Sequence, residues 1–265
     1  MAFRIFGAAL AAGLALTASE AKAEAWWSGD WHLTVGVTVF TAPDYDGARD
    51  YLFSASPLIS LGRAGGGTRF SSRNDNISLA FIDTGDFRAG ATGKVLFGRD
   101  SADHPRLVGL SDVRWGGEAG AFAEAYPLDW LRIRGEVRHG IRSHSGVVAD
   151  LAADAFVDIT PAVRLSGGPR LSFATGGYFD AYYGVDAIES AASGLAVYDP
   201  DGGLKSAGVG GAVTWKTTEK ITTSAFVEYS RLLGPAADSS IVRQGGSADQ
   251  VLVGASATYR FDFSM

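Results

Sequence analysis

Apolar residues stand at every second position over segments of roughly ten residues in much of this chain. The clearest segment runs from Val147 to Ile159, where the odd-numbered positions are apolar and the residues between them include Asp150, Asp154 and Asp158. Successive side chains of a β-strand point to opposite faces, so such a strand needs an apolar medium on one side and a wet medium on the other. Repeated along a whole exported chain, the pattern indicates a transmembrane antiparallel up-and-down β-barrel with lipid as the apolar medium.

A secretory signal peptide is predicted over residues 1–23 and implies export. Arg4 supplies the positive start, residues 5–16 form an apolar run, and Ala21 and Ala23 form a small-x-small cleavage site. The apolar run is too short to cross a bilayer as a helix, and no later stretch reaches the ~20 consecutive apolar residues that a spanning helix needs. Residues 24–265 are therefore expected to form the barrel, in the outer membrane of a Gram-negative bacterium.

About twelve strands are predicted. They cover residues 31–40, 51–62, 67–73, 76–83, 86–97, 113–126, 129–142, 147–159, 162–174, 205–216, 220–232 and 250–263. Bacterial barrels have an even number of strands and alternate short periplasmic turns with long external loops. The short and long connectors of this chain alternate in that way only if residues 67–83 form two short strands.

Composition narrows the function classes. The chain has 35 Gly, 8 Pro, 11% aromatic residues and a mean hydropathy of only +0.08, which suits strands with one polar face. Cys is absent, and this excludes disulfides, thiol catalysis and thiolate metal sites. It also excludes a lipoprotein anchor, so contact with outer-membrane lipid must come from the fold itself. The net charge of −6 gives no support to nucleic-acid binding.

Aromatic residues gather near the ends of the predicted strands, where the interfacial girdles of a barrel belong. They are Trp31, Phe40, Tyr51, Phe97, Trp115, Tyr126, Trp130, Phe173, Trp215 and Tyr259. The alternative is the aromatic core of a soluble β-sandwich.

Charged residues on three neighbouring strands are predicted to face the barrel interior. They are Arg132, Arg134, Glu136, Arg138, Arg142, Asp150, Asp154, Asp158, Arg164 and Arg170. An Arg facing lipid at mid-depth costs ~2 to 4 kcal/mol, so these side chains must point inward, where opposite charges neutralise one another across strands. This ladder is either a charged constriction that selects solutes or the packing of a narrow barrel.

No catalytic, cofactor or metal site is predicted. His139 and His144 lie near Ser143 and Ser145, as an acyl hydrolase at a barrel rim would require, but no flanking motif prepares a nucleophile. Five turn carboxylates are the remaining candidates for a divalent cation, although their spacing matches no known loop. They are Asp44, Asp46, Asp50, Asp199 and Asp201.

Several motifs along the mature chain resemble the MipA/OmpV family of outer-membrane proteins. They are Pro43-Asp44-Tyr45-Asp46-Gly47, Gly109-Leu110-Ser111-Asp112, the tyrosine-rich stretch from Tyr178 to Val185, Ser193-Gly194-Leu195 with Tyr198, and Tyr229-Ser230-Arg231-Leu232-Leu233-Gly234 leading to Asp238-Ser239-Ser240-Ile241-Val242. The family favours Ser-Pro at this last place. The resemblance implies a monomeric or weakly associating barrel and, from one studied role, a scaffold that joins a lytic transglycosylase to a murein synthase. Relatives in this family are also described as adhesins, as osmotic or antibiotic-response proteins, and as porins.

Two functions therefore stay open: a non-enzymatic scaffold for cell-wall enzymes, and a small-solute diffusion channel closed by residues 175–205 folding inward. The barrel assembly machinery is a further expected partner. Outer-membrane barrels usually end in Phe, whereas here Phe263 is followed by Ser264 and Met265.

Overall fold

The computed structural model describes residues 29–63 and 69–264, so the predicted signal peptide lies outside the described residues. Eleven strands and four short helices are present in the described part. The strands are β1 (Asp30–Pro43), β2 (Tyr51–Arg63), β3 (Ile77–Asp83), β4 (Phe87–Leu96), β5 (Gly116–Leu128), β6 (Leu131–Ile141), β7 (Val147–Thr160), β8 (Val163–Ala174), β9 (Gly203–Lys216), β10 (Ile221–Leu232) and β11 (Asp249–Ser264). The helices are α1 (Gly176–Tyr183), α2 (Ala187–Ser193), α3 (Gly234–Asp238) and α4 (Ser240–Gly245), with a single 3-10 turn at Ser101–Asp103.

All eleven strands belong to one antiparallel sheet in the order β2-β1-β11-β10-β9-β8-β7-β6-β5-β4-β3. The first strand pairs with the last, from Asp30 opposite Ser264 to Thr41 opposite Val253, so the sheet curls into a barrel. The all-β up-and-down barrel is therefore confirmed. Eleven of the predicted strands are present, with ends within three residues of those expected.

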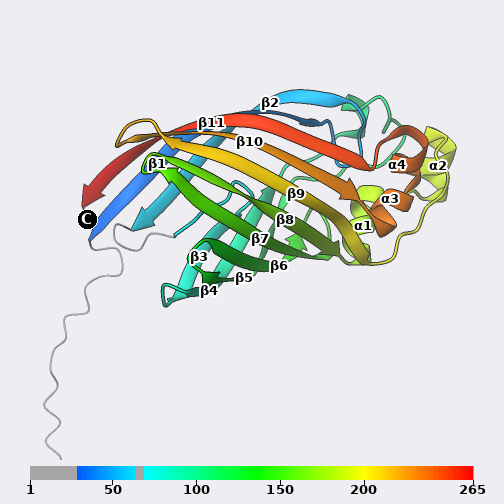
Figure 1. The fold of residues 1–265 in the computed structure, drawn as a ribbon. Helices are drawn as coiled ribbons and strands as arrows, with labels where there is room; N and C mark the ends of the chain where they lie inside the picture. Colours follow the sequence, from blue (N-terminus) through cyan, green and yellow to red (C-terminus); the bar gives the residue numbers. More distant parts are fainter. Residues whose placement is uncertain (1–28, 64–68, 265) are drawn as a thin grey trace, which may run out of the picture.

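The two ends of the barrel differ (Figure 1). Both described termini and the short turns lie at one end, called here the short-turn end. The long connectors and all four helices lie at the other, the long-loop end. No helix within the described residues is long and apolar enough to cross a membrane.

The alternating pattern places apolar side chains outside. Val137 on β6, Val157 on β7 and Val213 on β9 are about half exposed, as expected of residues that face lipid. Most of the aromatic residues predicted at strand ends are also exposed, including Trp115 and Trp130. Tyr126 is an exception, because its position in the alternation of β5 points inward, where it is buried beside Phe70 and Phe156.

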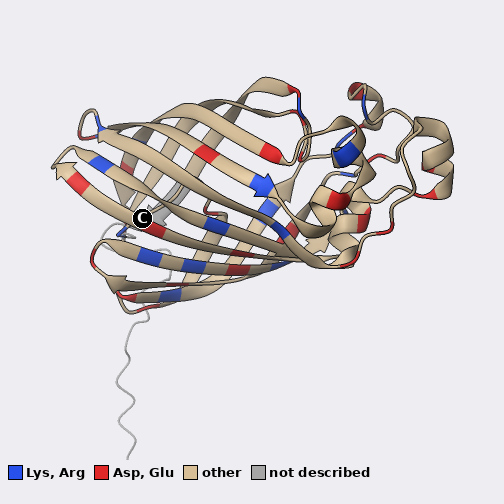
Figure 2. Ribbon diagram, turned by 45° about the vertical axis from the view of Figure 1, so that its right-hand side comes forward, with Lys and Arg blue, Asp and Glu red and all other residues tan. Residues whose placement is uncertain are grey.

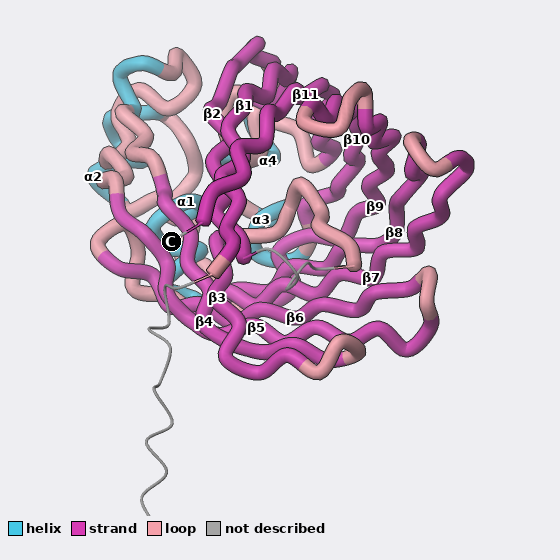
Figure 3. Tube along the Cα trace, turned by 90° about the vertical axis from the view of Figure 1, so that its left-hand side faces the viewer, coloured by secondary structure: helices cyan, strands magenta, loops and turns pink. Residues whose placement is uncertain are grey.

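The predicted strand over residues 67–73 is wrong for the residues that the structure describes. Residues 69–76, called the lumen segment below, form no strand and lie inside the ring of strands (Figure 3). Phe70 stacks on Phe156 of β7 with ring centroids 4.8 Å apart. The polar side chains that follow bind charged residues of the wall, so this segment lacks the apolar face that a lipid-facing strand needs. The described part of the strand expected over residues 67–73 therefore lies inside the barrel and does not belong to its wall.

The long loops pack together and form a compact cap at the long-loop end. One buried cluster joins α1 to the ends of β7, β8 and β10 through Phe179, Tyr183 and Leu232. A second joins the β1–β2 loop to the β4–β5 loop and α4, with Tyr45 and Leu107 among its members. Helix α1 therefore lies over the barrel mouth, held by apolar contacts to the ends of three strands and to the β10–β11 connector.

Candidate functional site

The charged interior is organised around β6. Arg132, Arg134, Glu136 and Arg138 alternate along this strand with outward residues such as Val137, and all four are at most 5% exposed. An isolated buried charge is costly, so each must find partners inside the barrel. Figure 2 shows basic and acidic positions side by side on neighbouring strands of this part of the wall, which is called the charged wall below.

Strand β7 provides carboxylates beside these arginines. Arg132 lies directly opposite Asp154 in the sheet, and its guanidinium donates to the Asp154 carboxylate at 2.7 Å. Asp150 accepts from Arg138, although Glu136, not Arg138, is its direct cross-strand partner. Cross-strand neutralisation therefore works partly through direct neighbours and partly through diagonal contacts.

Strand β5 contributes two buried glutamates that the sequence analysis missed. Glu118 accepts from Arg138 and Glu124 accepts from Arg134, both at 2.7 Å. Both glutamates are at most 4% exposed. The signal was present in the sequence, because each glutamate alternates with outward alanines in a strand that was predicted correctly.

The outer members of the predicted ladder occupy different surroundings. Arg170 of β8 binds Asp154 and so extends the buried network by one strand. Asp158 and Arg164 form a direct cross-strand pair at 2.7 Å near the short-turn end, where Asp158 is largely exposed. These two residues form a rim pair, separate from the buried network.

Arg142 does not point inward with the others. Strand β6 ends at Ile141, so the alternation no longer fixes the direction of the next side chain. Arg142 has φ +75° and is exposed, and its guanidinium lies over the Trp115 ring at 4.2 Å. Its predicted place in the lumen is therefore wrong.

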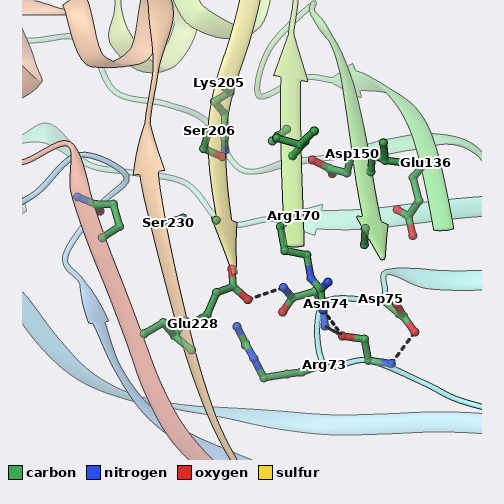
Figure 4. A pocket seen from close by; sticks show the side chains of 18 of the residues that line it. Arg73, Asn74, Asp75, Glu136, Asp150, Arg170, Lys205, Ser206, Glu228 and Ser230 are labelled. Atoms are coloured by element: carbon green, nitrogen blue, oxygen red, sulfur yellow. Dashed lines mark hydrogen bonds between the residues drawn. The ribbon is translucent and has the colours of Figure 1, made fainter. Parts of the chain in front are cut away.

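The lumen segment is bound to the charged wall by polar side chains. Both terminal nitrogens of Arg132 donate to Asp75, at 2.7 and 2.8 Å. Asn76 donates to Glu136 at 2.7 Å, and on the opposite side of the lumen Asn74 donates to Glu228 of β10. The segment thus reaches from β6 to β10 across the interior (Figure 4).

Two cavities border the lumen segment. A loop-side cavity of about 470 Å³ is lined by Asp46, Lys205 and Gln250 near the cap, and a turn-side cavity of about 860 Å³ is lined by His32, Thr222 and other residues nearer the short turns. Residues 72–76 line both. The lumen segment therefore stands between the two cavities.

His144 connects the cap to the charged wall. Its Nε2 lies 3.1 Å from Glu118, and its Nδ1 accepts from the backbone N–H of Gly146 at 3.2 Å. Because Nδ1 accepts a hydrogen bond, a neutral ring carries its proton on Nε2. The Nε2–H group then donates a hydrogen bond to the Glu118 carboxylate. The rings of Tyr178 and Tyr182 on α1 lie edge-on to it. Both nitrogens are thus engaged, and His139, the other candidate, is exposed on the outer face.

The turn carboxylates considered for a cation mostly bind basic side chains. Asp44 lies 2.7 Å from His104, Asp46 lies 3.0 Å from Lys205, and Asp50 lies 2.9 Å from Arg106. Asp199 and Asp201 lie in the connector before β9, apart from these pairs. Among the described residues, no group of three or more potential ligands is arranged to hold a metal ion.

Comparison with known proteins gives the family. The family model described as MltA-interacting protein MipA matches residues 35–261, which covers nearly the whole barrel. This protein belongs to the MipA family. It is accordingly an outer-membrane β-barrel of a Gram-negative bacterium. Bacterial barrels have short periplasmic turns and long external loops, so we expect the short-turn end of this MipA-family barrel to face the periplasm. No curated protein matches its sequence.

Solved outer-membrane proteins resemble the MipA-family barrel only distantly. A bacterial polysaccharide outer membrane secretin shares 10% identity at a TM-score of 0.45, over 87% of this chain and 98% of that one. The NanC porin shares 7% identity at a TM-score of 0.43, over 86% of this chain and 98% of that one. OmpT of Vibrio cholerae shares 8% identity at a TM-score of 0.40, over 87% of this chain and 97% of that one.

Proposed function

We propose that this protein is a non-enzymatic scaffold that binds murein enzymes at the periplasmic face of the outer membrane. The observation that carries the proposal is the lumen segment, which crosses the interior from Arg132 on β6 to Glu228 on β10. A barrel whose interior is occupied in this way suits binding better than passage. The family description, MltA-interacting protein, supports a murein enzyme as the partner.

The short-turn end is the surface that faces such partners. Two of the short turns carry exposed carboxylates close to Arg69, at the start of the lumen segment. Asp129 is fully exposed and lies 3.6 Å from Arg69, and Asp86 is largely exposed and lies 2.6 Å from Arg69. The scaffold would bind a lytic transglycosylase and a murein synthase through these turns and through the residues between β7 and β8 and between β9 and β10.

Cross-linking in intact cells tests this proposal. The barrel is then purified from solubilised outer membranes, and the co-purifying proteins are identified against those of control barrels. We expect lytic transglycosylase and murein synthase to be enriched, and we expect Asp86→Arg combined with Asp129→Arg to reduce their capture. Ile188→Ser, on exposed α2 at the external end, is the matched control and should leave capture unchanged. Equal capture by all variants would count against the periplasmic turns as the binding surface.

The two cavities favour a small-solute diffusion channel as a second candidate function. Both are lined by polar residues and both border the lumen segment, so displacement of residues 72–76 would join them. In that case Arg132, Arg134 and Asp154 would line the solute path. Conductance measurements on variants of the lumen segment distinguish this function from the scaffold.

A further inference from the structure

The part of the barrel wall that the structure describes has one place where neighbouring strands are not paired. Within residues 29–63 and 69–264, β2 pairs only with β1 and β3 pairs only with β4, so the described ladder is interrupted between β2 and β3. This interruption is called the seam below. Both strands run toward the short-turn end, so they could not form an antiparallel pair even if they met. Unpaired backbone groups in hydrocarbon cost several kcal/mol each, so a seam in a membrane wall calls for a specific explanation.

Residues of β2 agree with its position at the seam. Pro57 lies in the middle of this strand, opposite Val37 of β1. Proline has no N–H to donate and is confined to edge strands or bulges. β3 is the shortest strand of the sheet and has a register shift between Ala80 and Ile82. Both features are typical of strands that end a sheet.

The turn-side cavity reaches through the seam. Its lining includes Leu58 and Ile59 from β2 and Ile77 and Ser78 from β3. Ile59 and Ile77 belong to the outer face and are 71% and 75% exposed, whereas Leu58 and Ser78 follow the inward alternation. The same cavity therefore has walls both inside the barrel and on its lipid face. Its lining thus includes residues from both edges of the seam, with Ile59 on one side and Ile77 on the other.

The interior of this cavity is rich in hydroxyl groups. The walls from β1 and β8 to β11 supply Thr34, Thr38, Ser166, Thr214, Thr222, Ser224, Ser256 and Thr258. The Thr38 hydroxyl is buried and has no hydrogen-bond partner among the described residues. Thr38 therefore offers a polar contact to a molecule inside the cavity.

Arg73 provides a positive charge in the same cavity. Its guanidinium lies over the Phe226 ring at 4.6 Å, and it forms no ion pair with any carboxylate in the described part of the chain. The Glu228 carboxylate attracts this guanidinium through space, but its hydrogen bond comes from Asn74 (Figure 4). The other arginines that line this cavity, Arg88, Arg134 and Arg170, are all paired with acidic residues. Arg73 is thus the arginine of this cavity that has no ion pair among the described residues, so its guanidinium donors can reach an added anion.

We propose that the seam and the turn-side cavity bind a membrane amphiphile with an anionic head group and an acyl chain. The head group lies in the cavity, where Arg73 and the hydroxyl groups contact it. The acyl chain leaves between Ile59 and Ile77 and lies against the unpaired strand edges in the bilayer. The seam is inside the lipid-facing wall, so lipid is the molecule that it meets. This site is independent of the periplasmic turns assigned to scaffold binding.

Photo-cross-linking with a defined lipid tests the proposal. The full barrel is placed in phosphatidylcholine nanodiscs with a trace of lysophosphatidic acid that carries a diazirine in its acyl chain, and adducts are mapped by mass spectrometry. We expect adducts on Ile59 and Ile77 to exceed those on Val137 and Val213, which face lipid elsewhere. Equal labelling of the four positions would overturn the proposal.

Variants and a second probe test the contact with the head group. Arg73→Gln should lower labelling at the seam about tenfold, because a hydrogen bond between charged groups is lost, and leave labelling of Val137 unchanged. Arg73→Lys keeps the charge and should retain most of the labelling, which also controls for misfolding. Arg142→Gln removes an exposed arginine outside the cavity and should have no effect. A photoreactive monoacylglycerol with the same chain should label the seam weakly. Labelling by it as strong as by the phosphate probe, or labelling that is insensitive to Arg73→Gln, would overturn the assignment of an anionic head group.

Discussion

Arg132 on β6 and Asp75 in the lumen segment form a bidentate ion pair, with nitrogen–oxygen distances of 2.7 and 2.8 Å. Arg132 is 1% exposed and also binds Asp154. Planar two-point pairs of this kind fix geometry as well as providing energy. The pair therefore determines where the lumen segment lies within the barrel.

Removal of the Asp75 carboxylate should release the lumen segment. We expect Asp75→Ala to lower the free energy of unfolding by about 3 kcal/mol, because Arg132 loses one of its two principal partners in a buried site. Urea-induced unfolding of the barrel in liposomes measures this change. Asp158→Asn, which breaks the exposed pair with Arg164, is the control and should change stability far less, because solvent screens this pair. Equal effects of the two changes would show that the buried pair does not hold the segment.

The aromatic contact at the start of the lumen segment should matter in the same way. Phe70 is 5% exposed and stacks on Phe156 with an interplanar angle of 7°. We expect Phe70→Ala to destabilise the barrel by about 3 kcal/mol through the cavity that it leaves. Phe97 is 85% exposed, so Phe97→Ala should have a much smaller effect. Thermal unfolding followed by the heat-dependent shift in gel mobility compares the two variants.

Two glycines on paired strands give a sharper test of the charged wall. A Cβ at Gly120 of β5 would meet the Val137 carbonyl oxygen at 1.9 Å and the Arg138 Cα at 2.7 Å, whereas a Cβ at Gly135 of β6 would meet nothing within 4 Å. We expect Gly120→Ala to disturb the pairing of β5 and β6 and so the contact between Glu118 and Arg138. The yield of folded barrel should fall for Gly120→Ala and stay unchanged for Gly135→Ala. Normal folding of Gly120→Ala would contradict the close approach of these strands.

The contact between Asp46 and Lys205 in the cap should respond to pH only in acid. Attraction to Lys205, 3.0 Å away, holds the pKa of Asp46 below its ordinary value of 3.8. A carboxylate with a lowered pKa contributes stability above its unfolded-state pKa and loses this contribution as the pH falls through the folded-state pKa. The protection that this pair gives residues 44–50, measured as the difference in hydrogen exchange between the wild type and Lys205→Met, should therefore stay constant from about pH 8 to about pH 5 and decrease only below 3.8.

Tyr178 takes part in the same contact. Burial raises the pKa of Tyr178 to about 12, so its hydroxyl stays protonated and accepts a hydrogen bond from Lys205. Lys205→Met should remove both bonds and speed up exchange of residues 44–50 at neutral pH, where Asp46 is ionised. If this variant kept the slow exchange at neutral pH, Lys205 would not hold the loop to the cap.

Many strands of this barrel can be predicted from the local alternation of apolar and polar residues. Strand β7 could be predicted because its aspartates alternate with apolar residues, and the same rule applied to β5 would have found Glu118 and Glu124. The rule fails where the strand ends, which explains Arg142. It also fails for the lumen segment, whose position depends on contacts across the barrel such as Asp75 with Arg132, far apart in sequence. The seam follows from that segment, since the chain that would fill the wall lies inside.

Single-channel recording in planar bilayers tests most directly whether this barrel acts by binding and not by conduction. We expect the wild-type protein to give no stepwise conductance, because the lumen segment separates the two cavities, and Asp75→Ala to give detectable steps. Wild-type steps whose ion selectivity changes with Arg132→Ala combined with Arg134→Ala would contradict the account and identify the protein as a channel.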